Sequence, residues 1–367
     1  MKRFRYKNIL LYASHQWCGN IEEFFLKNTE KLVVFIVMPR VQNENNLVRL
    51  YVNGKLKSEK KLQINSNIFL YYFLWYINYL RVLFTYFNST EKITVISFHP
   101  HHYPGMSIQR LFRKLTFVFW VGDYFPPINL TLRIFERVKK YYHDRSEFAC
   151  YLGDGVNEKL NGRVMQTATR KTIMWGVNPK VGNKKAPNNT LLYVGVIRHN
   201  TTGLEIVYEF LSKNKSYNLN VIGVCDEETY RQEYQIIKKH KIEDQVYFPN
   251  KFYPDEDLEK IANKCFVGLA LYTTENTNVI YYSDPGKVKT YAELGLPVII
   301  TNTSCIIPYI RNFKSGEITQ RNAAALGEAI QKIKNNYKVY QDGLQKFNDF
   351  FNYERYYSER FTFLEEK

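Results

Sequence analysis

Short apolar strands alternate with helical patterns in both halves of this chain, and no other feature limits its fold as strongly. In the first half the strand candidates are 8–13, 32–38, 94–98, 117–121 and 148–152, and the helices between them include 21–26 and 68–87. In the second half the strands are 190–194, 219–224, 246–248, 265–271 and 298–301, with helices at 204–213, 229–240, 255–262 and 288–294. Such alternation is typical of parallel sheets with helices on their faces. We therefore expect an α/β fold with two Rossmann-like doubly wound domains in tandem.

The segment between these halves, WGVNPKVGNKK at 175–185, is rich in Gly, Pro, Asn and Lys and is the natural domain boundary. The chain has 367 residues, of which 45% are hydrophobic, and this is enough for two separate cores. We expect the first domain to end near residue 178.

Positive charge is concentrated in the first half. The net charge is +16, and up to residue 179 there are 26 Lys and Arg against 12 Asp and Glu, a balance of +14. The remainder has 25 against 23, a balance of +2. This asymmetry favours an anionic partner, either a membrane surface or a phosphorylated substrate, and a solvated basic surface is the alternative. Because no recognised nucleic-acid-binding module appears, we expect no nucleic acid.

Residues 68–87, IFLYYFLWYINYLRVLFTYF, have the length of a membrane span, but Asn78 and Arg81 are costly in hydrocarbon. We expect a helix packed under a sheet, and the alternative is an aromatic face resting on lipid headgroups. The N-terminus has the pattern of a first strand and not of a signal peptide. The five cysteines are widely spaced without a CxxC pair, which fits a reducing compartment. We therefore predict a cytoplasmic protein, with a peripheral position on the inner face of the plasma membrane as a further hypothesis.

The stretch DPGKVKTYAELGLPVI at 284–299 combines a loop, a helix and a buried strand. Pro285 and Gly286 end the loop, Lys287 stands at the start of the helix, and Gly295 ends it. Unpaired N–H groups and positive partial charge gather at a helix N-terminus, so a lysine there suits a phosphate group. The alternative is an ordinary αβ unit whose lysine is solvated.

In doubly wound sheets ligands bind beyond the carboxyl ends of the strands, so the residues that follow each strand are candidate ligands. In the second half, the loop from Gly195 to Gly203 could hold a diphosphate, with Arg198 offsetting its charge. In the first half the candidates are His15, Trp17, Gly19, His99, His101, His102 and Asp123. No carboxylate or cysteine stands near the histidine cluster at a useful spacing, so we expect no metal site.

Three segments together resemble the donor domain of GT-B glycosyltransferases, in the broad group around family 4. They are LLYVGVIRHNTTGLE (191–205), VYFPNKFYPDEDLEKIANKC (246–265) and DPGKVKTYAELGLPVI. The first half matches this fold in layout, and residues 347–364 resemble the C-terminal helix that crosses back to the first domain. The resemblance implies an acceptor-binding domain at 1–178, with 346–367 crossing back, and a nucleotide-sugar donor domain at 179–345 across a cleft.

The resemblance also implies roles for individual residues. The donor-binding positions would be Gly195, Arg198, Asn250, Lys251, Phe252, Asp284, Pro285, Gly286, Lys287 and Thr290. The acceptor-binding positions would be His15, Trp17, Gly19 and His101. Two positions depart from the family pattern, because Thr202 replaces a glycine-linked lysine and Thr290 replaces a ribose-binding glutamate.

Glycosyl transfer from a nucleotide sugar leaves two negative charges on the departing diphosphate. A basic site at a helix N-terminus can stabilise these charges without a metal. We predict that Arg198 and Lys287 supply this stabilisation. If the reaction inverts the anomeric carbon, a base must deprotonate the acceptor, and Asp123 is the best-placed candidate. The predicted function is transfer of a sugar from a UDP- or GDP-sugar, with no other cofactor, to a lipid-linked or polysaccharide acceptor. Two alternatives are a non-catalytic GT-B partner or scaffold protein, suggested by Thr202 and Thr290, and a GT-B sugar-nucleotide epimerase.

Overall fold

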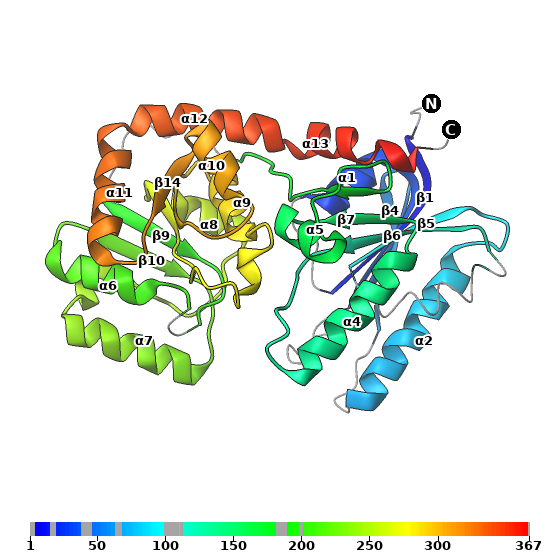
Figure 1. Cartoon of the computed structure of the whole chain (residues 1–367), viewed down its shortest axis with the longest axis horizontal. Helices are drawn as coiled ribbons and strands as arrows, with labels where there is room; N and C mark the ends of the chain where they lie inside the picture. Colours follow the sequence, from blue (N-terminus) through cyan, green and yellow to red (C-terminus); the bar gives the residue numbers. More distant parts are fainter. Residues whose placement is uncertain are drawn as a thin grey trace. The chain divides into compact units, whose positions relative to one another are not determined.

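The chain forms two compact units (Figure 1). The computed structural model describes residues 4–14, 20–37, 46–62, 68–98, 110, 113–180, 189–198 and 201–365. Unit 1 comprises Met1–Met174 and Tyr353–Lys367, and unit 2 comprises Trp175–Asn352. The division therefore falls at 174/175 and 352/353, a few residues from the expected 178/179 and 345/346.

Unit 1 is built on an eight-stranded sheet with the order β4-β3-β2-β1-β5-β6-β7-β8. Six neighbouring strands, β2, β1, β5, β6, β7 and β8, are mutually parallel, as the alternation predicts. Their central members are buried on both faces, as parallel strands between helical layers are. The bounds are β1 (Tyr6–Ser14), β2 (Thr29–Val37), β3 (Asn46–Val52), β4 (Lys55–Leu62), β5 (Ile93–Ser97), β6 (Leu115–Val121), β7 (Phe148–Tyr151) and β8 (Arg170–Thr172).

One edge of this sheet differs from the predicted parallel arrangement. β3 runs antiparallel to β2, and β4 runs antiparallel to β3. Asn53 and Gly54 join β3 to β4, and both have positive φ angles, 55° and 76°, as a tight hairpin turn requires. The Asn-Gly pair is a hairpin signal that the search for βαβ units overlooked. The edge strand β4, KLKSEKKL, is largely exposed, and its lysines oppose pairing with another sheet edge.

The helices of unit 1 include the predicted helix at 68–87, which is α2. Tyr79, Val82 and Leu83 are buried, so one side of this helix packs into the core as expected. Phe73 and Phe84 are 60% and 64% exposed. No helix in the described part of the chain combines the length and apolarity needed to cross a bilayer. The helices are α1 (Ile21–Asn28), α2 (Ile68–Tyr86), α4 (Leu130–Arg145), α5 (Asp154–Asn161) and α13 (Tyr353–Arg360).

The C-terminal segment completes the core of unit 1. The ring of Phe361 lies with its centre 5.4 Å from that of Trp120 and 5.2 Å from that of Phe25. The predicted single helix over 347–364 is wrong, because α12 (Tyr337–Phe351) and α13 are separate helices. They are interrupted at Asn352, which leaves the helical conformation (φ −50°, ψ 116°) to form a β-bridge with Val177.

Unit 2 is built on a six-stranded parallel sheet with the order β11-β10-β9-β12-β13-β14. In order along the chain this is 3-2-1-4-5-6, the doubly wound Rossmann order. All the strands predicted for the second half are present, and β14 was not predicted. The bounds are β9 (Thr190–Val194), β10 (Asn218–Ile222), β11 (Val246–Tyr247), β12 (Val267–Ala270), β13 (Val298–Thr301) and β14 (Gly316–Thr319).

The helices of unit 2 bury an apolar face against this sheet. Ile206, Val207 and Leu211 of α6 and Leu326 and Ile330 of α11 all belong to one core cluster. The helices are α6 (Leu204–Lys213), α7 (Glu227–His240), α8 (Asp255–Ala262), α9 (Gly286–Glu293), α10 (Ile307–Phe313), α11 (Ala323–Asn335) and α12. The predicted α/β fold with two Rossmann-like units is therefore confirmed.

Candidate functional site

The strand order of unit 2 reverses between β9 and β12, and ligands of doubly wound sheets bind beyond the strand ends at such a point. β9 and β12 pair at only two positions, Leu191 with Val267 and Leu192 with Gly268. Beyond that pairing the chain leaves β9 through the loop that begins at Gly195. The fold therefore places the predicted glycine loop at this reversal point.

Glycines allow the segments at this edge of the sheet to approach one another. Gly195 has φ +128°, and a Cβ on Gly223, just after β10, would lie 1.8 Å from the Gly195 carbonyl oxygen. Gly203, at the start of α6, has φ +77°, and a Cβ there would lie 2.4 Å from the Leu271 carbonyl oxygen. Neither Gly203 nor Gly223 has space for a side chain.

Tyr291 fixes helix α9 to the same two strands. Its hydroxyl accepts a hydrogen bond from the Val194 N–H (3.0 Å) and donates one to the Leu269 carbonyl (2.8 Å). Its ring packs directly on Gly268, because a Cβ added to Gly268 would lie 2.3 Å from the Tyr291 Cγ. Because Val194 ends β9 and Leu269 belongs to β12, this one hydroxyl bridges the strands where they separate.

Lys287, in the first turn of α9, reaches the glycine loop. A Cβ on Gly195 would lie 3.7 Å from the Lys287 Nζ. The same nitrogen lies 3.9 Å from the centre of the Tyr193 ring and 5.1 Å from that of Tyr272, in cation–π range. Within the described residues it forms no salt bridge, and burial lowers the pKa of Lys287 to about 7. This ammonium group therefore sits on two aromatic faces beside the loop, without a carboxylate partner in the described chain.

Arg198 lies on the same loop, with an exposed side chain. Its carbonyl accepts hydrogen bonds from the Thr201 and Thr202 hydroxyls, at 3.2 and 3.1 Å. The Thr202 hydroxyl, at the position where the resemblance predicts a lysine, is therefore bonded within the loop. The structure brings Gly195, Arg198 and Lys287 to one edge of the unit 2 sheet.

The segment after β11 is held to the end of β10. Asn250 accepts a hydrogen bond from the Cys225 N–H through its Oδ1 (2.9 Å), in a left-handed conformation (φ 49°). Lys251 forms a bridge with Gly223 and has an exposed side chain, and Phe252 is 63% exposed. An aromatic ring left in solvent at a strand end can stack on a flat ligand. The Asn250 side chain, by contrast, is occupied by Cys225.

The start of α9 has the features that an anion site requires. Pro285 caps the helix, no side chain caps the N-terminus, and a Cβ on Gly286 would have open space around it. Thr290 turns its hydroxyl back to the Gly286 carbonyl, at 3.3 Å. The hydroxyl that replaces the family's glutamate is therefore bonded within the helix.

Asp284, a predicted donor contact, lies inside unit 2. Its side chain is fully buried, accepts a hydrogen bond from the Trp175 N–H (2.9 Å), and lies 3.6 Å from the Lys289 Nζ. Lys289 in turn lies 3.0 Å from the centre of the Phe351 ring. Burial raises the pKa of Asp284 and lowers that of Lys289 to about 8. This pair joins the start and the end of unit 2, so one carboxylate oxygen of Asp284 has a structural part, and its contact with a donor stays a prediction.

In unit 1, Asp123 follows β6 with an exposed side chain. Its carbonyl accepts a hydrogen bond from the Lys139 Nζ (2.7 Å), and Glu136 accepts one from the Phe125 N–H (2.9 Å). Both anchors are buried residues of α4. The loop that carries Asp123 is therefore fixed by polar contacts from that helix.

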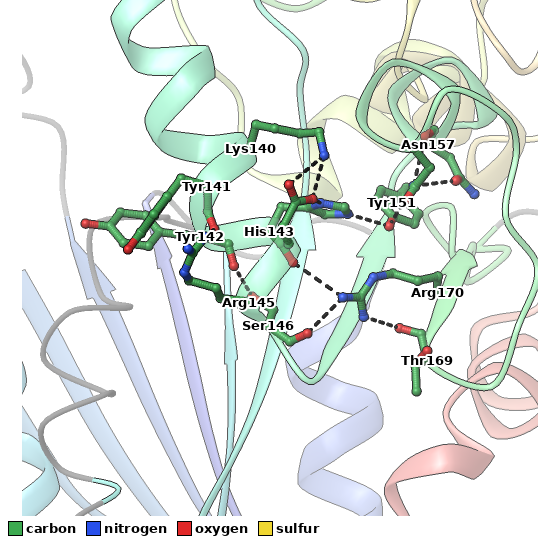
Figure 2. A network of polar contacts seen from close by, with 12 residues as sticks. Lys140, Tyr141, Tyr142, His143, Arg145, Ser146, Tyr151, Asn157, Thr169 and Arg170 are labelled. Carbon is green, nitrogen blue, oxygen red and sulfur yellow. Dashed lines mark hydrogen bonds and ion pairs between the residues drawn. The ribbon is translucent and has the colours of Figure 1, made fainter.

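A polar network continues from α4 to β7 and β8 (Figure 2). His143 lies between Asp144 (Nδ1 to Oδ1, 2.8 Å) and the Tyr151 hydroxyl (Nε2 to Oη, 2.7 Å), and Arg170 donates to the Ser146 carbonyl (2.8 Å). Burial lowers the pKa of His143 to about 4, so this histidine is neutral at pH 7. The other acceptor-side predictions, His15, Trp17, Gly19 and His101, lie outside the described residues.

Sequence reasoning overlooked the tyrosines of the site. Tyr193, Tyr272 and Tyr291 lie in apolar or helical patterns that also fit an ordinary core, and all three are buried. Only Tyr291 stands inside the segment already singled out, four residues after Lys287 and so on the same side of the helix.

Solved structures with the same fold include several glycosyltransferases. Sucrose-phosphate synthase (tll1590) from Thermosynechococcus elongatus superposes with a TM-score of 0.70 at 14% identity, over 97% of each chain. Anabaena Alr3699/HepE in complex with UDP gives 0.67 at 10% identity, over 97% of this chain and 99% of its own. The lipopolysaccharide outer core galactosyltransferase WaaB gives 0.64 at 13% identity, over 98% and 99%. No curated protein matches the sequence.

Two Rossmann-like units, together with the likeness to these solved structures, define the GT-B fold. Residues 177–345 match the family of glycosyl transferases group 1. Unit 2 therefore carries the segment that matches this family, and the chain as a whole has the fold of the glycosyltransferases named above.

Proposed function

We propose that unit 2 binds the diphosphate of a UDP- or GDP-sugar between the Gly195 loop and the N-terminus of α9. The observation that carries this proposal is the position of Lys287, whose ammonium group lies beside Gly195 without a carboxylate partner in the described chain. A cation in such a place gains most from an incoming anion. HepE, which has the same fold, was solved with UDP, and this supports a uridine donor.

In this proposal each donor-side residue has a defined part. Gly195 lets the diphosphate approach the backbone, Lys287 and Arg198 offset its charge, and the uncapped N–H groups after Pro285 add partial positive charge. Asn250, Lys251 and Phe252 would lie along the nucleobase through backbone contacts. Thr290 is not assigned to the ribose, because its hydroxyl is bonded to Gly286.

The proposed reaction needs no metal. The bond between the anomeric carbon and the diphosphate oxygen breaks, the electron pair stays on the diphosphate, and the acceptor hydroxyl forms the new bond to carbon. Lys287, Arg198 and the helix N-terminus stabilise the two charges of the leaving group. In an inverting reaction Asp123 would take the acceptor proton.

We further propose that the acceptor is a lipid-linked or polysaccharide glycan reached at the cytoplasmic face of a membrane. The balance of +14 up to residue 179 supports an anionic surface as the neighbour of unit 1. In this proposal the enzyme acts in polysaccharide or glycolipid synthesis as a peripheral membrane protein.

A thermal-shift screen with UDP, GDP, CMP and dTDP, each with and without EDTA, tests the donor assignment. We expect one nucleoside diphosphate to stabilise the protein equally in both conditions, and slow release of that nucleotide from its sugar donor. Loss of the shift in EDTA would contradict metal independence. Interconversion of the sugar without nucleotide release would indicate an epimerase, and no shift with any nucleotide would overturn the proposal.

A further inference from the structure

Helix α4 of unit 1 has an inverted distribution of side chains. Its buried residues are Glu136, Lys139 and His143, which are all polar. Its large apolar residues Leu130, Ile134 and Tyr141 are 69%, 53% and 51% exposed. Surface helices normally place apolar residues inward and polar residues outward. The outward residues therefore do not contribute to the core of the unit.

Polar contacts hold the inward face of α4 in place. Lys139 and Glu136 form a buried ion pair and bind the backbone of Asp123 and Phe125, respectively. His143 is bound by Tyr151 of β7. Each of these three side chains has at least one polar partner, and such buried contacts can anchor a helix as apolar ones do. The helix is thus attached firmly without using Leu130, Ile134 or Tyr141.

The exposed apolar residues form one stripe along the helix. Residues 130, 134 and 141 are spaced by four and seven, so they lie on the same side of an α-helix. Ile128, just before the helix, is 68% exposed. In Figure 2 the ring of Tyr141 points away from the His143 network, with Arg145 folded over it at 3.6 Å from the ring centre. We call this surface, formed by 128, 130, 134 and 141, the α4 stripe.

Basic side chains flank the α4 stripe. Arg133, Arg137, Lys140 and Arg145 are exposed on either side of it. The only exposed acid within α4, which is described in full, is Asp144, and it is paired with Lys140 at 2.6 Å. An apolar stripe between guanidinium and ammonium groups matches the boundary between acyl chains and anionic headgroups.

We propose that the α4 stripe docks unit 1 into the headgroup layer of an anionic bilayer. Leu130, Ile134 and Tyr141 enter the boundary with the acyl chains, and Arg133 and Arg137 bind lipid phosphates. The occupant is a lipid surface because the exposed charges of α4 beside the stripe are positive, apart from Asp144, which is bound to Lys140, and this charge complements anionic lipid. This inference rests on the proposed function for its purpose, since Asp123 lies on the loop that α4 anchors and would thereby be held close to a membrane-bound acceptor.

Co-sedimentation of the full chain with vesicles tests the proposal. The vesicles are phosphatidylcholine alone or mixed with phosphatidylglycerol. We expect binding to the anionic vesicles only. The variant Leu130→Ser with Ile134→Ser, and the variant Arg133→Gln with Arg137→Gln, should each weaken it by about tenfold or more. Two matched controls alter exposed residues of unit 2. They are Val339→Ser on α12 and the double variant Lys238→Gln with Lys239→Gln on α7, and both should bind as the wild type does.

Three outcomes would overturn the proposal. They are no vesicle binding by the wild type, unchanged binding of both α4 variants, and a dimer in analytical ultracentrifugation that the Leu130→Ser, Ile134→Ser variant abolishes. The last outcome would assign the stripe to a second copy of the chain. Nucleotide-induced thermal shift without vesicles reports the donor site separately and should not change in any variant. Vesicle binding without any nucleotide shift would instead contradict the proposed function and leave the docking surface intact.

Discussion

The ammonium nitrogen of Lys287 lies 3.9 Å from the centre of the Tyr193 ring. Tyr193 belongs to β9 and Lys287 to α9, so this contact joins the first strand of unit 2 to the segment with the family's most recognisable pattern. Tyr272 covers the same nitrogen from the end of β12. The rings orient the charge toward Gly195, and a diphosphate there would meet a cation whose hydration shell is already partly removed.

Loss of Arg198 should lower donor turnover. We expect Arg198→Gln to reduce kcat/KM for the nucleotide sugar by about 10²-fold, because one group that stabilises leaving-group charge is typically worth about that much. Steady-state nucleotide release measures this. Arg231→Gln, an exposed arginine of α7, serves as the control and should have no effect. Equal rates for wild type and Arg198→Gln would remove Arg198 from the site.

Donor affinity should fall as the pH rises above 7. Burial lowers the pKa of Lys287 to about 7, so the free enzyme loses the ammonium charge above that pH, while a bound diphosphate favours the protonated form. Affinity is then highest below pH 7 and decreases by up to about tenfold per pH unit above it. Titrations of UDP or GDP from pH 6 to 9 measure the effect, and Lys287→Arg, which stays charged, should flatten it. A flat wild-type profile would show that Lys287 does not bind the anion.

The same pKa has a consequence for stability. Between pH 7 and the ordinary lysine value of 10.5, the unfolded chain holds a proton on Lys287 that the folded chain has released. The contribution of this residue to the free energy of unfolding therefore increases with pH across that window. Comparing wild type with Lys287→Met by urea unfolding at pH 7 and 9 should show a smaller rise in the variant. A parallel pH dependence would contradict the lowered pKa of Lys287.

Removal of the Tyr291 hydroxyl should destabilise unit 2. Tyr291→Phe leaves the Val194 N–H and the Leu269 carbonyl without their partner, at a cost of about 1–3 kcal/mol. Urea unfolding measures the loss. Tyr247→Phe removes an exposed hydroxyl that contacts Tyr253, and should cost much less. Equal effects of the two substitutions would show that the bridge between β9 and β12 contributes little.

If the reaction inverts the anomeric carbon, Asp123→Asn should separate transfer from donor binding. We expect transfer to the acceptor to fall by about 10²–10⁴-fold, with unchanged nucleotide affinity, because the base acts only on the acceptor hydroxyl. Asp144→Asn, a carboxylate of the same unit bound to Lys140, is the matched control. Retained transfer in Asp123→Asn would assign the base elsewhere.

Much of the fold could be predicted because each βα unit of unit 2 carries its own signals. The β-branched run at 298–301 and the Gly295 helix stop locate α9 and β13, and the strand order then follows from the general topology of such sheets. The β3–β4 hairpin escaped prediction since its lysine-rich edge strand has little apolar alternation. The break at Asn352 has no local signal, because it depends on a bridge to Val177 far away in the sequence.

The site was predictable to the extent that it depends on helix ends and loops. Lys287 and Gly195 were identified from their places at such ends, and the structure brings them together. The burial of Asp284 could not be predicted, because only the fold brings Trp175 and Lys289 against its carboxylate. The polar inner face of α4 was equally hidden, since its partners Phe125 and Tyr151 lie on other elements.

Isothermal titration calorimetry tests the donor site most directly. UDP or GDP is titrated at pH 6.5 into the wild type and into the variants Lys287→Gln and Lys213→Gln. Lys213 is an exposed lysine of α6 and serves as the control. We predict that wild type and Lys213→Gln bind UDP or GDP alike and that Lys287→Gln weakens binding by about tenfold or more. Wild-type affinity in Lys287→Gln would contradict the assignment of Lys287 as the residue that holds the diphosphate.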